Sequence, residues 1–190
     1  MEKVQGNFKK LRYPLPVTLV GAIVKGKPNY LTIAYFAILS HLPPIVSVSL
    51  SKKHYTVSGI RESGSFSVNV PSVEMVKVTD YCGIVSGRKV DKSNLFKSFF
   101  GQLNTAPMIE DCPLNFECKL FRTVEAGSNL IFMGEVIPVY ANGKVLTEGV
   151  PDIRKIDPLV LFGADYHSWE LGPQIAQAYK IGKEFKDKAS

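Results

Sequence analysis

The sequence predicts a mainly β protein with peripheral helices, built as a mostly antiparallel β-barrel. Roughly seven or eight strand patterns follow one another along the 190 residues, and several are joined by short hairpin turns. Helical patterns fall between only some of the strands, whereas a parallel sheet would alternate the two regularly. The composition, with 45% hydrophobic and 21% charged residues, is that of one globular domain spanning residues 1–190.

The strands of the first half are predicted from apolar runs and from the turns between them. Residues 17–24 form a continuous apolar run typical of a buried strand, and the turn residues at 25–29 lead into its partner. The Pro43-Pro44 pair breaks any helix and opens another strand. The strands expected in this half are residues 17–24, 30–36, 45–50 and 66–70.

Three helices are expected, each placed by residues typical of helix ends. Ser51 or Thr56 can cap the first helix, and Gly64 stands at its expected stop. Ser72 can cap the second helix. The predicted ranges are residues 51–63, 72–81 and 173–185.

The second half adds longer strands with alternating or apolar patterns. Turn residues at 126–129 separate two of them, and Asn142-Gly143 marks a further hairpin turn. The aromatic and polar residues at 163–171 predict a loop. The expected strands are residues 114–124, 130–140 and 159–162.

Charge and cysteine content exclude several classes of function. The net charge of +6 is moderate and its cations are scattered, which does not favour nucleic-acid binding. Cys82, Cys112 and Cys118 have no metal-binding spacing, and neither do the three histidines, so no metal site is expected. No stretch is long and apolar enough to span a bilayer, and we expect a cytoplasmic protein that does not bind membranes.

The segment at residues 81–92 is the most unusual in composition. It combines the thiol of Cys82, two glycines, the hydroxyl of Ser86 and three cations including Lys92. Glycines allow close approach of a backbone to a ligand, and N–H groups with cations suit anionic or carbonyl oxygens. For the segment taken alone, a solvated helix end with a glycine stop is the better interpretation.

A second candidate site is the junction at residues 49–56, where a strand ends and a helix is expected to begin. Helix N-termini bind anions, and serines, a threonine, a histidine and two lysines crowd this point. Helix capping with exposed lysines is the other interpretation, and both remain open. On the strand at residues 29–36, Thr32 and Ala34 could lie flat against a planar ring, although a core strand has the same pattern.

No catalytic residue can be assigned. Cys82 has no histidine that the sequence places beside it, and a free cysteine is usually a small buried apolar residue. Residues 165–169, around His167, combine acidic, imidazole, hydroxyl and aromatic side chains of the kinds found in functional sites. A loop packed over the core explains this composition as well. Dinucleotide-binding, Walker and nucleophile-elbow signatures are absent.

The order of several weak motifs carries more information than any one of them. The motifs are Tyr13-Pro14-Leu15-Pro16-Val17, Lys27-Pro28-Asn29 with Thr32 and Ala34, Pro43-Pro44, residues 49–56, residues 66–71, residues 80–92, Ala106-Pro107 and residues 114–118. In this order and spacing they resemble the flavoredoxin branch of the flavin reductase-like, FMN-binding split-barrel family, over a core of about residues 11–182.

The resemblance implies a split β-barrel homodimer that holds FMN near the subunit interface. By position in the motifs, Asn29, Thr32, Ala34 and Tyr35 resemble the part that meets the flavin ring. The residues that resemble the family's binding site for the ribityl and phosphate groups are Ser49, Ser51, Lys52, His54 and Thr56. Three more residues resemble flavin contacts of the family, namely Ser86, Gly87 and Lys92.

The resemblance implies an FMN-dependent oxidoreductase of flavoredoxin or flavin reductase type. Electrons from a reduced donor such as NAD(P)H would pass through FMN to a small acceptor such as flavin or ferric iron. The alternative is a non-enzymatic FMN electron carrier that works with a protein redox partner. The sequence alone leaves the donor, the acceptor and the roles of Cys82 and His167 open.

Overall fold

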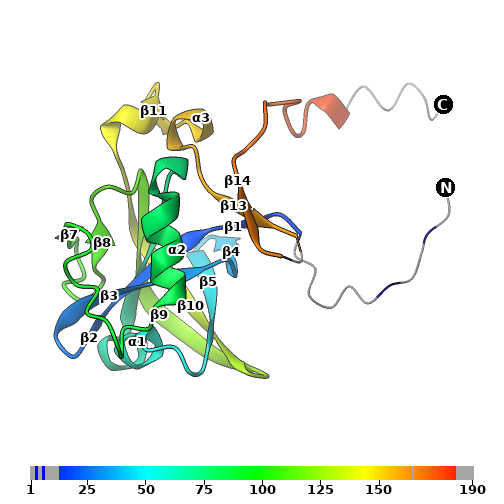
Figure 1. Ribbon diagram of the computed structural model, residues 1–190. Helices are drawn as coiled ribbons and strands as arrows, with labels where there is room; N and C mark the ends of the chain where they lie inside the picture. The colour runs from blue at the N-terminus through cyan, green and yellow to red at the C-terminus, as the bar shows by residue number, and fades with distance from the viewer. Residues whose placement is uncertain (1–2, 4–5, 7–12, 164, 183–190) are drawn as a thin grey trace.

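A seven-stranded antiparallel sheet forms the body of the protein (Figure 1). The computed structural model describes residues 3, 6, 13–163 and 165–182. In spatial order the strands are β3 (Lys27–Ile33), β2 (Thr18–Val24), β6 (Ser65–Val70), β9 (Leu114–Ala126), β10 (Asn129–Ala141), β5 (Pro44–Ser51) and β4 (Phe36–His41). The sheet curls, but β3 and β4 are not paired with each other, so the barrel is open along one side. The predicted mainly β fold and its split barrel are confirmed.

The hairpin of β2 and β3 pairs the predicted strands, but its turn is shorter than the predicted one at residues 25–29. Val24 of β2 pairs with Lys27 of β3, so the turn contains only Lys25 and Gly26, both at positive φ. This is the two-residue geometry that matches strand twist best. Residues 37–41, which the sequence left without a clear pattern, belong to β4.

The barrel interior is filled by alternating apolar side chains of the strands. Val48, Leu50, Phe66 and Phe132 are almost fully buried in one cluster that includes residues from β2, β5, β6, β9 and β10. Burial of this kind supplies most of the favourable free energy of folding. It also fixes the register, because a slip by one residue would turn these side chains outward.

Helix α1 (Thr56–Ser63) is shorter than the predicted helix at residues 51–63. Ser51 still belongs to β5, and residues 52–55 form the connection. Neither predicted side-chain cap is present, since Tyr55 occupies the N-cap position without a side-chain hydrogen bond. The predicted stop is confirmed, because Gly64 adopts the left-handed conformation with φ of 66°.

Helix α2 (Val76–Ile84) follows a short 3-10 turn, η1 (Val73–Met75), and runs beyond the predicted end at residue 81. Cys82 is therefore helical and fully buried, where it packs with Leu19 and Tyr30. Packing of this face overrides the glycine signal of Gly83, which lies inside the helix. Ser72 occupies the N-cap position of η1 without a side-chain hydrogen bond, so its predicted capping bond is absent.

A smaller sheet joins the two ends of the described chain. It contains β1 (Leu15–Pro16), β13 (Val160–Phe162) and β14 (His167–Trp169), in that order. The predicted loop at residues 163–171 thus includes strand β14. The remaining short elements are β7 (Ser98–Phe99), β8 (Met108–Ile109), η2 (Gly143–Val145), β11 (Leu146–Thr147), β12 (Val150–Pro151) and α3 (Ile153–Ile156).

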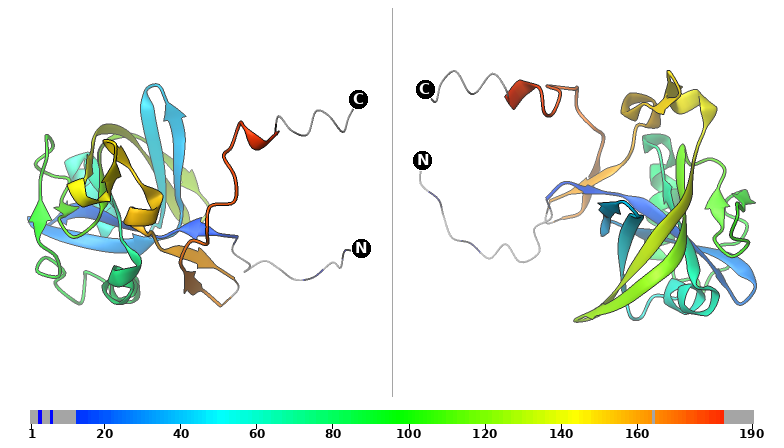
Figure 2. Two further views of the ribbon diagram at one scale, coloured as in Figure 1. Left: turned by 90° about the horizontal axis from the view of Figure 1, so that it is seen from above. Right: turned by 180° about the vertical axis from the view of Figure 1, so that it is seen from behind.

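The predicted terminal helix is wrong for residues 173–177, residues 178–182 form only a short turn that ends in 3-10 geometry, and residues 183–185 lie outside the described part. Residues 170–182 run away from the sheets, and Figure 2 shows this from two further sides. Ile175 and Tyr179 are 96% and 95% exposed. Short helices depend on tertiary packing, and this segment has an exposed side chain at every described position. No helix in the described residues is long and apolar enough to cross a membrane.

Candidate functional site

Three adjoining cavities lie in a row along strand β3. The polar cavity, of about 250 Å³, is lined by Asn29, His54, Thr56, Ser86, Gly87 and Lys92 among others. The middle cavity, of about 460 Å³, is lined in part by Thr32, Ala34, Tyr35, Ser49, Ser51 and His54. The apolar cavity, of about 310 Å³, includes Val17, Ile33, Val76, Thr79, Asp80 and Leu159. His54 lines both the polar and the middle cavity, and Thr32, Ile33 and Ala34 line both the middle and the apolar one.

Asn29 of β3 holds an unused acceptor beside the polar cavity. Its Nδ2 donates a hydrogen bond to Thr56 Oγ1 at 2.9 Å, which ties β3 to the start of α1. Its Oδ1 is buried and has no partner among the described residues. Buried polar atoms without a partner are rare and costly, so this oxygen suits a ligand that donates a hydrogen bond.

Gly87 brings the backbone of the connection after α2 close to Asn29. A Cβ at this position would lie 2.1 Å from Asn29 Oδ1 and 2.7 Å from Tyr55 Cδ1. Any larger side chain would therefore displace both neighbours. Glycine is required here for space, as expected where a backbone closes around a ligand.

Lys92 places a buried ammonium at the same cavity. Its Nζ donates hydrogen bonds to the carbonyl oxygens of Tyr30, at 2.9 Å, and Cys82, at 2.8 Å. The residue is 2% exposed, and in the described part of the chain it forms no ion pair with a carboxylate. Burial lowers the pKa of this ammonium. A buried cation held only by carbonyl dipoles favours a nearby anionic or electron-rich ligand.

His54 lies where the polar and middle cavities meet. Its Nδ1 is buried without a partner among the described residues, and its backbone N–H donates to Ser51 O at 2.9 Å. Burial, and then the positive charge of Lys92, lower the pKa of the imidazole below its usual value. The ring is therefore neutral at pH 7 and can both donate and accept.

The middle cavity is less charged, because none of the described residues that line it is lysine, arginine, aspartate or glutamate. Thr32 Oγ1 donates to the backbone oxygen of Thr79 in α2, and Ala34 offers a small side chain next to it. From the other side, Ser49 Oγ accepts a hydrogen bond from Asn129 Nδ2 at 3.1 Å. A row of small and hydroxyl side chains between two strands leaves room for a planar group.

The sequence missed three residues that line the middle cavity. Asn129 was interpreted only as part of a turn, and Leu161 and Tyr166 come from the segment near the C-terminus. Local sequence contains no signal for these contacts, because they depend on how β10 and β13 meet β3. Their positions follow from the topology alone.

Lys52 is the one predicted contact that the structure places apart from these cavities. Its ammonium pairs with Glu125, and its backbone N–H donates to Ser128 O at 3.0 Å. It thus joins β5 to the β9–β10 hairpin. Its role as a cofactor contact stays a prediction.

Two further residues left open by the sequence lie outside the polar cavity. Burial raises the pKa of the Cys82 thiol, and the side chain packs in the core below α2. His167 lies on β14, exposed, with its Nε2 3.5 Å from a carboxylate oxygen of Asp165. Neither the Cys82 thiol nor the His167 imidazole lies in the kind of environment that activates a nucleophile.

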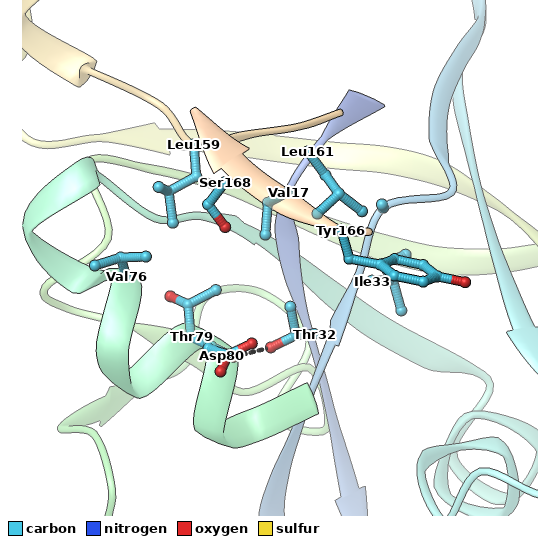
Figure 3. A pocket seen from close by; sticks show the side chains of 11 residues that line it. Val17, Thr32, Ile33, Val76, Thr79, Asp80, Leu159, Leu161, Tyr166 and Ser168 are labelled. Carbon is cyan, nitrogen blue, oxygen red and sulfur yellow. Dashed lines mark hydrogen bonds between the residues drawn. The ribbon is translucent and has the colours of Figure 1, made fainter. Parts of the chain in front are cut away.

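The apolar cavity lies between α2 and the β13–β14 hairpin (Figure 3). Thr79 and Asp80 project toward it from α2, and Leu159, Leu161 and Ser168 face it from the opposite side. Val17 and Ile33 form its floor between them. Its wall of aliphatic side chains contrasts with the donors and cations of the polar cavity.

Comparison with known proteins decides the family. Residues 11–170 match the family described as "Flavin reductase like domain". The chain belongs to the flavin reductase-like family. The split barrel is therefore this family's fold.

Two solved flavoredoxin structures are closely similar to this chain. The chain is 48% identical to flavoredoxin from Methanosarcina acetivorans, with a TM-score of 0.94 over 97% of this chain and 100% of that one. It is 33% identical to flavoredoxin of Desulfovibrio vulgaris, with a TM-score of 0.88 over 96% and 100%. Among curated relatives of this flavin reductase-like chain, the NADH-dependent FAD reductase of Streptomyces globisporus is 27% identical over 72% of each chain.

Proposed function

We propose that this flavin reductase-like protein binds FMN and acts as an oxidoreductase of flavoredoxin or flavin reductase type. The observation that carries the proposal is the polar cavity. Among the described residues, the buried Asn29 Oδ1 and His54 Nδ1 have no hydrogen-bond partner there and the Lys92 cation has no carboxylate partner, while Gly87 keeps space free. A ligand with hydroxyl donors and a negative charge satisfies all of these groups at once, and FMN carries both.

The residues present fit FMN along the row of cavities. Thr56, Ser86 and Lys92 provide donors for phosphate and ribityl oxygens, and Asn29 Oδ1 accepts from a ribityl hydroxyl. Thr32, Ala34 and Tyr35, with Ser49 and Ser51 opposite, would hold the ring in the middle cavity. His54, which lines both cavities, would contact the flavin ring on one side and the ribityl and phosphate groups on the other.

The bound flavin supplies the electron-transfer chemistry, while the protein binds, orients and tunes it. Lys92 holds its positive charge at the polar cavity, which shares His54 with the proposed ring site, and from there it would favour negative charge on a reduced ring.

As an enzyme, the protein would take electrons from a reduced donor such as NADH or NADPH and reduce a small acceptor such as flavin or ferric iron. The relative named as an NADH-dependent FAD reductase favours this version. The alternative is an electron carrier with a protein redox partner, and the two flavoredoxin structures leave it open.

The homodimer and the cytoplasmic location are part of the same proposal. Exposed apolar side chains around the β4–β5 hairpin, at Ile38, Leu39 and Leu42, support a subunit contact. Leu42 is 92% exposed, which is unusual for an isolated leucine at a hairpin tip.

A titration of flavin-free protein with FMN and with riboflavin tests the binding proposal. We expect one FMN bound per chain, and riboflavin bound more weakly because it lacks the phosphate. Equal affinities for the two would contradict the role of the polar cavity. Steady-state oxidation of NADH or NADPH with added flavin or ferric iron then separates enzyme from carrier.

A further inference from the structure

The apolar cavity is separate from the residues that would hold the phosphate and ribityl parts of FMN. Its contact with the proposed ring site is through Thr32, Ile33 and Ala34, which line both. A molecule in the apolar cavity would therefore lie beside the ring. Its volume of about 310 Å³ is near the lower end of the usual range for small-molecule pockets, roughly 300–1,000 Å³.

The lining of this cavity selects against anions. Much of its lining is aliphatic, from Val17, Ile33, Val76 and Leu159 among others, and its polar side chains are mainly hydroxyls. Among the described residues that line it, none is lysine, arginine or histidine, and Asp80 contributes a carboxylate. An anionic ligand would lose its hydration here and meet a like charge, so the occupant is uncharged or cationic.

One buried hydroxyl gives the cavity a specific polar contact. Thr79 is 2% exposed, and its Oγ1 is buried without a hydrogen-bond partner among the described residues. Figure 3 shows its side chain directed from α2 into the space below Leu159 and Ser168. The backbone oxygen of Thr79 accepts from Thr32 Oγ1, which fixes this turn of α2 against β3. A ligand carbonyl that accepts from the Thr79 hydroxyl would satisfy it.

We propose that the apolar cavity binds a small uncharged quinone as the electron acceptor. This inference rests on the proposed FMN function. A quinone is a neutral, mainly apolar ring whose carbonyl oxygens accept hydrogen bonds, which matches the lining and the Thr79 hydroxyl. Reduction of a quinone to its hydroquinone consumes two electrons and two protons, and oxidation of one fully reduced flavin releases the same number of each. Ferric chelates that carry negative charge would not enter.

Equilibrium binding to the oxidised, FMN-loaded protein tests the proposal without turnover. The probes are menadione and its sulfonate analogue, in which an anionic sulfonate replaces the ring methyl. Isothermal titration calorimetry is expected to show menadione bound and the sulfonate at least roughly tenfold weaker, because of Asp80 and the apolar wall.

Two conservative variants assign the contacts. Thr79→Val keeps the side-chain shape and is expected to weaken menadione by roughly fivefold to tenfold. Asp80→Asn is expected to strengthen the sulfonate while menadione binds as before. Thr123→Val and Asp111→Asn, both exposed and away from the three cavities, serve as matched controls.

The outcomes separate this inference from the function on which it rests. The inference is overturned if FMN binds but menadione does not, if Thr79→Val binds menadione as tightly as the parent protein, or if the sulfonate binds equally well. If FMN itself fails to bind, the proposed function fails and the inference with it. A titration with FMN, carried out on each variant first, shows which case applies.

Discussion

The polar and apolar cavities flank the same strand, yet they are built from opposite chemistry. The polar cavity has a buried lysine, a neutral histidine and an amide oxygen that has no partner in the described part of the chain. The apolar cavity has aliphatic walls, one carboxylate and one buried hydroxyl. The contrast fits the two proposals: the polar end would anchor a charged ligand, and the apolar end would hold a neutral one beside the middle cavity.

The largest expected effect comes from filling the polar cavity. Gly87→Val would place atoms against Asn29 Oδ1 and Tyr55, and overpacking of this kind costs about 1–3 kcal/mol, which lowers FMN affinity by up to roughly a hundredfold. Fluorescence titration of the flavin measures this. Gly143→Val is the matched control, because no atom lies within 4 Å of a Cβ there. Unchanged FMN affinity in Gly87→Val would place the ligand elsewhere.

A charge change at the same cavity is expected to have the next largest effect. Asn29→Asp places a carboxylate beside the proposed phosphate site and should weaken FMN by roughly thirtyfold, or about 2 kcal/mol. Riboflavin, which has no phosphate, should be weakened much less. The same titrations on Asn94→Asp, an exposed position, provide the control. Equal losses for FMN and riboflavin would show that the effect is not electrostatic.

Removal of the Lys92 ammonium tests what the buried charge of the polar cavity contributes to stability and to the flavin potential. Lys92→Met leaves the carbonyl oxygens of Tyr30 and Cys82 without this donor, so the free energy of unfolding should fall by about 1–3 kcal/mol. The flavin midpoint potential should fall by roughly 30 mV, because the reduced ring loses a stabilising charge. Spectroelectrochemical titration measures it, with Lys144→Met as control. An unchanged midpoint potential would remove Lys92 from the tuning of the flavin.

The smallest effect concerns the pH dependence of the flavin-free protein. The pKa of His54 is lowered in the folded protein by burial and by Lys92, and unfolding returns it to about 6.5. The unfolded chain thus binds more protons, and stability is lost as pH falls below about 6.5 toward the folded pKa. The loss should stay below about 1 kcal/mol, because the half-exposed ring is screened by water. Urea unfolding of His54→Gln should show a flatter profile, and an identical profile would contradict this origin.

The sequence predicted the polar cavity better than the apolar one, for a physical reason. Asn29, Gly87 and Lys92 lie in polar segments whose composition is unusual for a core, so they were visible as candidates. Val17, Thr79 and Leu159 look like ordinary core residues, and only the fold, which packs α2 against β3, brings them to one cavity. Contacts between segments so far apart in the chain have no local signature.

The errors in secondary structure have the same origin. Helix α2 continues past residue 81 because Cys82 finds a buried environment against Leu19 and Tyr30, which overrides the glycine signal. Residues 173–182 have a helical pattern but exposed side chains throughout, and only residues 178–182 form a short turn, while residues 173–177 have no regular structure. The strands and their antiparallel order were predictable because alternation and turn residues are local signals.

The most direct test of the account is the identity of the flavin in the purified protein. The protein should be yellow with flavin absorption bands, and denaturation should release FMN, in an amount close to one per chain. Chromatography of the released cofactor distinguishes FMN from FAD and riboflavin. A colourless protein that also fails to take up added FMN would contradict the central claim.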